Sequence, residues 1–252
     1  MFNHEGPARN ARSNSVLAGY LAFVAGFANA SGLILFGAFT SHVTGNVARV
    51  SASLARGDFR EAAPAGLLVA VFLFGAVTAS LLVETNLFRR TSSAYGAALL
   101  VQGGLLSAFV ATGAASLLSF AMGMQNSLVT RLSGSVVRTT HLTGVVTDLG
   151  IEIARWARWK WSKAFGGRLA APGRNPAVRP TPTRSLLLLT IALTFTAGGM
   201  LGALAAPAWG ARSIAVPAVA ILLAAAYAFA AGPSRNDTLA QTPANTDAKR
   251  TT

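Results

Sequence analysis

Residues 16–39 read VLAGYLAFVAGFANASGLILFGAF and contain no Asp, Glu, Lys or Arg. An uncharged stretch of this length is typical of a helix that crosses a bilayer, which takes about 20 residues. Four more uncharged stretches follow, at 62–83, 91–130, 185–211 and 213–234. The longest of them is long enough for two helices, with a break near Gly113. The sequence therefore predicts an all-α, polytopic transmembrane helical bundle with six spans, embedded in a lipid bilayer.

The composition supports a membrane protein. Only 12% of the residues are charged and 52% are hydrophobic, whereas a soluble globular protein carries about 25% charged residues. A soluble bundle would also have charged residues every three or four positions along its helices, and the uncharged stretches have none. The chain contains no cysteine, which excludes disulfides, thiolate nucleophiles and cysteine-based metal sites. We expect no cofactor.

The formal net charge is +13, and basic residues are concentrated between 131 and 184 and near the chain ends. Such a bias sets the orientation of helices in a membrane, so we expect no nucleic-acid partner. With the basic side in the cytoplasm, the chain is predicted to lie in the bacterial cell inner membrane with both termini cytoplasmic. Residues 1–15 form the N-terminal tail, ahead of an uncleaved first span. The polar residues 233–252 form a disordered C-terminal tail.

A basic cytoplasmic loop is predicted at 148–184. Trp156, Trp159 and Trp161 alternate there with Arg and Lys. A helix of this composition is typical of the headgroup region, where it would contact anionic lipid. The alternative is an ordinary solvated loop.

An internal repeat is the strongest pattern in the chain. Residues 40–47 read TSHVTGNV, and residues 139–146 read TTHLTGVV. Upstream of them, GFAN at 26–29 corresponds to GMQN at 123–126. In each case the HxTG motif is followed by two long apolar stretches. The repeat unit is therefore a span that carries an Asn, a short HxTG half-helix segment, and two more spans.

The two predicted copies are 16–113 and 114–232. With three spans in each copy they must be inverted relative to each other, as is common in secondary transporters. The alternative is that each HxTG segment also crosses the membrane, which gives four plus four parallel spans. We favour six spans because Arg49, Asp148 and Glu152 lie within or just after the HxTG segments, and charges at mid-membrane are unfavourable.

The candidate substrate-binding residues are polar groups in or near these repeated motifs. An amide in hydrocarbon needs a partner, a His can relay protons, and the free N–H groups of a helix beginning at a Thr can hold a small polar or anionic solute. The alternatives are interhelical hydrogen bonds, a His at a helix end and a tight turn. Two His without nearby carboxylates do not make a metal site. The candidates are Asn29, His42, Thr44, Asn46, Gln125, Asn126, His141, Thr143 and Asp148.

Equivalent positions of the two copies carry opposite charges. Arg49 follows Gly45 by four residues, and Asp148 follows Gly144 by four. The two side chains form a buried pair at the interface of the copies, or they lie apart on opposite faces. A local pair of Glu152 with a basic residue three positions later is favoured by helical spacing.

The motifs also resemble a known family. GFANASGLILFGAFTSHVTGN at 26–46 and AMGMQNSLVTRLSGSVVRTTHLTGVVTDLG at 121–150 resemble the YoaK-like family of bacterial membrane proteins, also known as domain-of-unknown-function family 1275. The resemblance covers about residues 16–231. It implies a multi-pass membrane protein without an established activity. Many members have an Asp where this chain has Asn29, so the resemblance implies no proton or cation coupling through that position here.

No catalytic signature is present. The sequence lacks GxSxG, P-loop and HExxH motifs, and no carboxylate has a His at a spacing typical of a catalytic pair. We therefore expect no enzyme. The favoured function is a small-molecule transporter or permease of unknown substrate. The alternative is a non-transporting membrane protein that binds a partner or lipid, as a scaffold or envelope-stress component.

Overall fold

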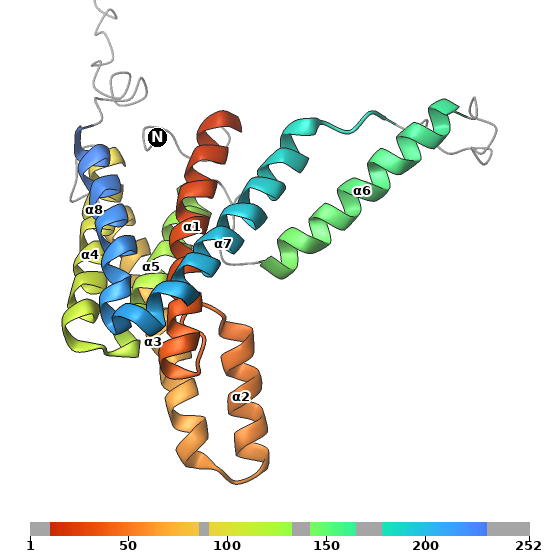
Figure 1. The fold of residues 1–252 in the computed structure, drawn as a ribbon. Coiled ribbons are helices and arrows are strands. Elements are labelled where there is room, and N and C mark those ends of the chain that lie inside the picture. The colour runs from red at the N-terminus through yellow and green to blue at the C-terminus, as the bar shows by residue number, and fades with distance from the viewer. Residues whose placement is uncertain (1–10, 86–90, 133–141, 165–177, 231–252) are drawn as a thin grey trace, which may run out of the picture.

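The computed structural model describes residues 11–85, 91–132, 142–164 and 178–230. All regular secondary structure in these residues is helical (Figure 1), which confirms the prediction of an all-α chain. The helices are α1 (Ala11–Phe36), α2 (Val43–Ala55), α3 (Phe59–Glu84), α4 (Thr91–Thr112), α5 (Ala115–Leu132), α6 (Leu142–Ala164), α7 (Pro182–Trp209), the 3-10 helix η2 (Gly210–Ile214) and α8 (Ala215–Ala230).

Four stretches of the described residues are long and apolar enough to cross a membrane: Ser15–Phe36, Phe59–Glu84, Ser92–Thr112 and Pro182–Ala230. The last has 49 residues and contains both α7 and α8. Helix α5 is not among them, because it carries several Ser, Gln and Asn residues and ends near Arg131. The membrane class thus follows from the helices themselves, while the number of crossings depends on how α5, α7 and α8 are counted.

The break predicted in the longest apolar stretch is present. Helix α4 ends at Thr112 and α5 begins at Ala115, and Gly113 between them has a φ of 68°. This left-handed backbone conformation favours glycine, which has no Cβ to clash. Helix α3 begins after Asp58, whose side chain accepts a hydrogen bond from the backbone N–H of Glu61, as is typical of an N-cap.

Three pairs of helices form the bundle: α1 with α7, α3 with α5, and α4 with α8. The first two pairs approach closely at glycines, where an added Cβ would overlap a backbone carbonyl of the partner helix. In one of these contacts Gly202 meets the carbonyl of Phe27. Each of the other four glycines follows a Phe by three residues, and that Phe supplies the carbonyl that meets the partner's glycine. The contacts are Gly26 with Phe195, Gly198 with Phe23, Gly75 with Phe120, and Gly123 with Phe72.

The interior is tightly packed, and large apolar side chains also cover the outside. Tyr95, Phe109 and Met122 are fully buried. In contrast, Phe74 on α3 and Leu204 on α7 are 63% and 71% exposed. Extended apolar surfaces of this kind are unusual in soluble proteins and are expected where helices contact lipid.

Helices α2 and α6 lie at the side of the bundle. In Figure 1 they begin near its middle and run away in opposite directions, α2 beside α3 and α6 toward the start of α7. Helix α2 has 13 residues, but α6 has 23. The prediction of a short second HxTG segment, separate from the Trp-rich helix, is therefore wrong. Both belong to one continuous helix, which contains no Pro and runs on through Gly150 to Ala164.

Several predicted features fall outside the described residues. These are the C-terminal tail 233–252, most of the N-terminal tail 1–15, His141, and part of the basic loop 148–184. Helix α1 begins at Ala11, so the last residues assigned to the N-terminal tail are helical.

Candidate cavity between the two halves

A cavity of about 540 Å³ lies where the first turns of α2 and α6 meet the bundle. Its volume is in the range of small-molecule sites. Residues from both halves of the chain line it: Asn29, Phe39, Ser41, His42, Val43, Thr44, Phe72, Asn126, Thr130, Leu142, Thr143 and Phe195. Five of the nine candidate substrate-binding residues therefore come together here, namely Asn29, His42, Thr44, Asn126 and Thr143.

The two Asn side chains are held differently. The Oδ1 of Asn29 accepts hydrogen bonds from the backbone N–H and the hydroxyl of Ser41, at 3.3 Å and 2.9 Å. These bonds fix the chain between α1 and α2 against α1. The Nδ2 group of Asn29 donates no hydrogen bond among the described residues. The Nδ2 of Asn126 donates to the carbonyl of Met122, one turn earlier in α5, at 2.9 Å.

The beginnings of α2 and α6 supply further polar groups. Thr44 and Thr143 both lie in the first turn of their helix and line the cavity. His42 is the N-cap of α2, but its side chain makes no capping hydrogen bond. Its ring packs edge-on against Phe39, with 5.1 Å between the ring centres. Because the first N–H groups of a helix have no partner within the helix, the start of α2 presents donors near the cavity.

Phe72 and Phe195 are lining residues that the sequence analysis missed. A Phe within an apolar span looks like any lipid-facing or core residue, so its type alone carries no signal. The spacing does carry a signal. Each of these two Phe residues lies three residues before a glycine that makes one of the close helix contacts. Four of the five Phe-x-x-Gly sequences in the chain, these two among them, supply the carbonyls of those contacts.

Three further candidates, Asn46, Gln125 and Asp148, lie elsewhere in the described residues, and His141 falls outside them. Asn46 is buried and donates to the carbonyl of Phe39 at 2.7 Å, which shapes the turn before α2. Gln125 is fully buried between helices; it donates to the carbonyl of Leu21 at 2.8 Å and accepts from Gln102 at 2.9 Å. Both side chains are thus held by contacts within the protein. Asp148 lies on α6 and takes part in an ion pair.

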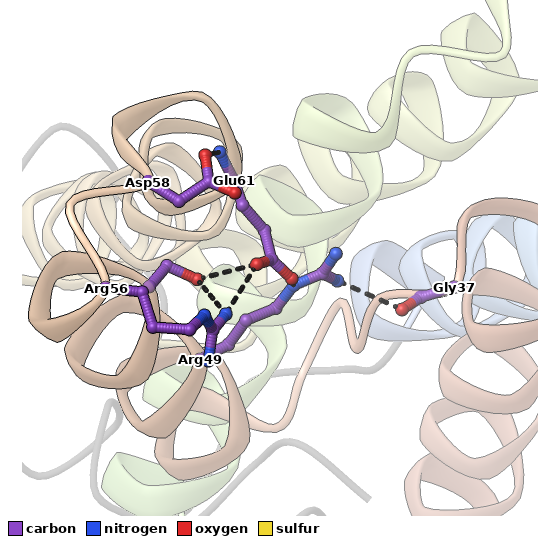
Figure 2. A network of polar contacts seen from close by, with 6 residues as sticks. Gly37, Arg49, Arg56, Asp58 and Glu61 are labelled. Carbon is purple, nitrogen blue, oxygen red and sulfur yellow. Dashed lines mark hydrogen bonds and ion pairs between the residues drawn. The ribbon is translucent and has the colours of Figure 1, made fainter.

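An ion-pair network joins α2 to α3 (Figure 2). Glu61 accepts from Arg49 at 3.2 Å, from Arg56 at 2.8 Å and from the hydroxyl of Ser53 at 3.0 Å. Arg49 also donates to the carbonyl of Gly37, at 3.2 Å, just beyond the end of α1. The network therefore fixes α2 both to α3 and to the loop that follows α1.

A second network joins α6 to α7. Arg184 lies 3.3 Å from Asp148 and 3.6 Å from Glu152. Glu152, whose side chain is only 4% exposed, also accepts from Arg155 at 2.7 Å, which confirms the pair predicted from helical spacing. The alternative of an Arg49–Asp148 pair is wrong. Each of the two has a closer partner on the helix that follows it, so neither needs the other for compensation.

The two networks occupy matching sequence positions. Arg49 and Asp148 each lie four residues after the Gly of an HxTG motif. Glu61 lies eleven residues before Phe72, and Arg184 lies eleven residues before Phe195. Counted from the HxTG motifs and from these two Phe residues, the two ion pairs lie at matching positions, with the acidic and basic partners exchanged.

The Trp residues of α6 are not equally accessible. Trp156 and Trp159 pack edge-on, with 5.7 Å between ring centres, and Trp156 donates to Ser185 at 3.3 Å. Lys163 and Arg179 approach the ring of Trp159 within 5.6 Å and 5.5 Å. Trp161, by contrast, is 65% exposed.

No group of three or more His, Asp or Glu side chains in the described residues could hold a metal ion. Together, the helices and their apolar exterior define an integral membrane protein with a cavity, lined by both polar and aromatic side chains, between its halves.

The chain belongs to the family described as "Protein of unknown function (DUF1275)", whose model matches residues 17–227. It is 28% identical over 209 residues, 83% of each chain, to a UPF0700 transmembrane protein of Rhizobium meliloti (strain 1021). No solved structure matches it.

Proposed function

We propose that this protein is a small-solute transporter or permease of the bacterial inner membrane, in which the cavity binds the solute. The observation that carries the proposal is that the two halves contribute equivalent residues to one cavity. They do so in three pairs: Asn29 with Asn126, Thr44 with Thr143, and Phe72 with Phe195. Solute sites of secondary transporters lie in this way near the interface of internal repeats.

In the proposed topology the halves are inverted and each has three spans. The pattern of helix pairs supports this, because exchanging the halves converts the α1–α7 pair into the α5–α3 pair and leaves α4–α8 unchanged. The opposite directions of α2 and α6 agree with inversion. Helix α5 can serve as a span despite its polar residues, since α1, α3 and α4 surround it and shield it from lipid.

The proposed orientation places α6 at the cytoplasmic face and the end of α2 outside. Arg155, Arg158, Lys160 and Lys163 lie on the exposed part of α6, and basic residues favour the cytoplasmic side. Both termini are then cytoplasmic.

The ion-pair networks give the transporter a means of closing each side. The pair of Arg49 and Glu61 holds α2 against α3 at the outer end, and the pair of Asp148 and Arg184 holds α6 against α7 at the inner end. In this mechanism, separation of one pair lets the first turn of its helix move and opens the cavity to that side. We assign no catalytic role to the cavity, because no described carboxylate lines it beside His42.

Access to the cavity tests this proposal. The native chain lacks cysteine, so Thr44→Cys and Thr143→Cys introduce single thiols at the cavity. A membrane-impermeant thiol reagent should label each of them from the outside in whole cells and from the inside in inverted vesicles. Leu73→Cys, at a 61% exposed apolar position of α3, is the control and should label from neither side. Labelling of both cavity thiols from one side only would contradict a transporter.

A specific observation also supports a lipid contact. Trp161 is exposed on a helix that carries four basic residues, and such a side chain sits well at the headgroup level of an anionic leaflet. This contact is compatible with transport. It would stand alone as a lipid-binding function if the cavity proves closed to both sides.

A further inference from the structure

The cavity has no charged wall in the part of the chain that the structure describes. Its described lining residues include no Asp, Glu, Lys or Arg. Arg131, next in sequence to the lining residue Thr130, is paired with Glu84. A carboxylate or ammonium group that entered the cavity would lose its water without gaining an opposite charge, which is strongly unfavourable. The lining therefore favours an uncharged solute.

The wall of the cavity is rich in rings. Phe39, Phe72, Phe195 and His42 all line it. Two of them, Phe72 and Phe195, come from corresponding positions of the two halves. Aromatic side chains gain most from a flat, unsaturated partner, which can stack on a ring face or meet its edge. A flexible, saturated polyol would gain less from these walls.

The polar groups at the cavity can orient a planar solute. The Nδ2 group of Asn29 is an available donor, because the hydrogen bonds of this side chain are made through Oδ1. The hydroxyls of Thr44 and Thr143 can donate or accept. The first N–H groups of α2 add donors that need carbonyl or ring-nitrogen acceptors. An aromatic amide or a nitrogen heterocycle carries both hydrogen-bond donors and acceptors on one planar framework.

We propose that the cavity binds an uncharged, planar molecule of one or two rings that carries amide or ring-nitrogen groups, held between aromatic walls and hydrogen-bonded to Asn29, Thr44 and Thr143. This inference rests on the proposed transport function and specifies its substrate class. It disfavours the anionic solutes that the helix N-termini alone would allow.

The test uses matched probes on the purified full chain in lipid nanodiscs. Benzamide, nicotinamide and uracil are uncharged and planar. Benzoate and nicotinate keep the rings of the first two but carry a carboxylate, and cyclohexanecarboxamide keeps the amide on a saturated ring. We expect at least one planar amide or uracil to bind. Where benzamide or nicotinamide binds, its carboxylate analogue should bind at least tenfold more weakly, and cyclohexanecarboxamide should also bind at least tenfold more weakly.

Variants locate the binding. Phe72→Leu and Phe195→Leu keep apolar bulk and the backbone contacts of the helix pairs but remove the rings, and each should weaken binding of the planar probe about tenfold or more. Phe74→Leu, on the 63% exposed face of α3, is the matched control and should bind as the native chain does. The inference is overturned if benzoate binds as well as benzamide, if no planar uncharged probe binds, or if both ring variants bind normally.

The outcome is separable from that of the access experiment. If thiols at Thr44 and Thr143 are labelled from both sides but no planar probe binds, the transporter proposal stands and the substrate class is wrong. If a planar probe binds and needs Phe72, but the thiols are reached from one side only, the site is a binding site without transport.

Discussion

The α2–α3 and α6–α7 regions each contain an ion pair between their two helices, and the acidic and basic partners are exchanged between the two regions. In the first, an Arg on the short helix meets a Glu on the following helix; in the second, an Asp meets an Arg. The attraction between two charges does not depend on which partner carries which sign. The two regions therefore share an ionic connection between a helix and the helix that follows it, while the residues that make the connection differ.

The two regions differ in what surrounds the pair. In the α2–α3 region, Glu61 has three donors, Arg49, Arg56 and Ser53. In the α6–α7 region, Arg184 instead has two carboxylates, Asp148 and Glu152. Helix α6 then continues through three Trp and several basic residues, whereas α2 ends at Ala55. One region ends in a compact turn and the other extends as a helix rich in Trp and basic residues.

The largest expected effect is at the glycines that let the halves pack. In Gly26→Ala the new Cβ would overlap the carbonyl oxygen of Phe195, and in Gly123→Ala that of Phe72. Overpacking against backbone should lower the free energy of unfolding by about 3 kcal/mol. Because the two positions correspond, the two losses should be similar. Gly104→Ala is the control, since nothing lies within 4 Å of its added Cβ. Equilibrium unfolding in mixed micelles measures this, and equal stability of all three variants would refute the packing account.

A smaller loss is expected at a position where the halves differ. Gln125 corresponds to Ala28 in the first half, and both are fully buried. Gln125→Ala removes the acceptor of Gln102, and a buried amide without its partner should cost about 2 kcal/mol of unfolding free energy. Adding Gln102→Leu should recover part of that loss, because the unsatisfied group is then gone. A double variant less stable than Gln125→Ala would contradict this explanation.

The ion pairs should contribute less to stability. The side chains of Arg184 and Asp148 are 49% and 41% exposed, so the pair is screened by solvent and is worth about 1 kcal/mol or less. Asp148→Arg and Arg184→Asp made singly should each destabilise the chain slightly. Made together, they give the second half the charge order of the first and should restore most of the loss. If the loss of unfolding free energy in the double variant equals the sum of the losses in the two single variants, the two residues are not energetically coupled.

The smallest change in stability is expected at Trp161. Because this side chain is 65% exposed, Trp161→Ala should alter the unfolding free energy by about 0.5 kcal/mol or less. It should nevertheless reduce the amount of anionic phospholipid that remains bound after purification, measured by native mass spectrometry. Trp156→Ala is the contrasting variant, because that ring packs against Trp159 and Ser185. Unchanged lipid retention in Trp161→Ala would remove the proposed lipid contact.

Sequence alone predicted the elements better than their contacts. The uncharged stretches predicted the long apolar helices, and Gly113 predicted the break between α4 and α5, because both features depend on local composition. The predicted site residues in the cavity, such as Asn29 and Thr143, stood out as repeated polar groups. Gln125 was named as a site candidate, but it lies buried between helices. The sequence of a span does not distinguish a polar residue that lines a cavity from one that bonds to a neighbouring helix. The pairing of Arg49 with Glu61 was not predicted, because the two residues lie on different helices and the turn between them hides any regular spacing.

The central claim is that the two halves lie inverted across the membrane around one cavity. Ala55 and Ala164 are the last residues of α2 and α6, and both are exposed. Single Ala55→Cys and Ala164→Cys variants are therefore matched reporters of the two helix ends. An impermeant thiol reagent should label Ala55→Cys only in whole cells and Ala164→Cys only in inverted vesicles. Labelling of both thiols from the same side would contradict the inverted arrangement, and with it the proposed transport path.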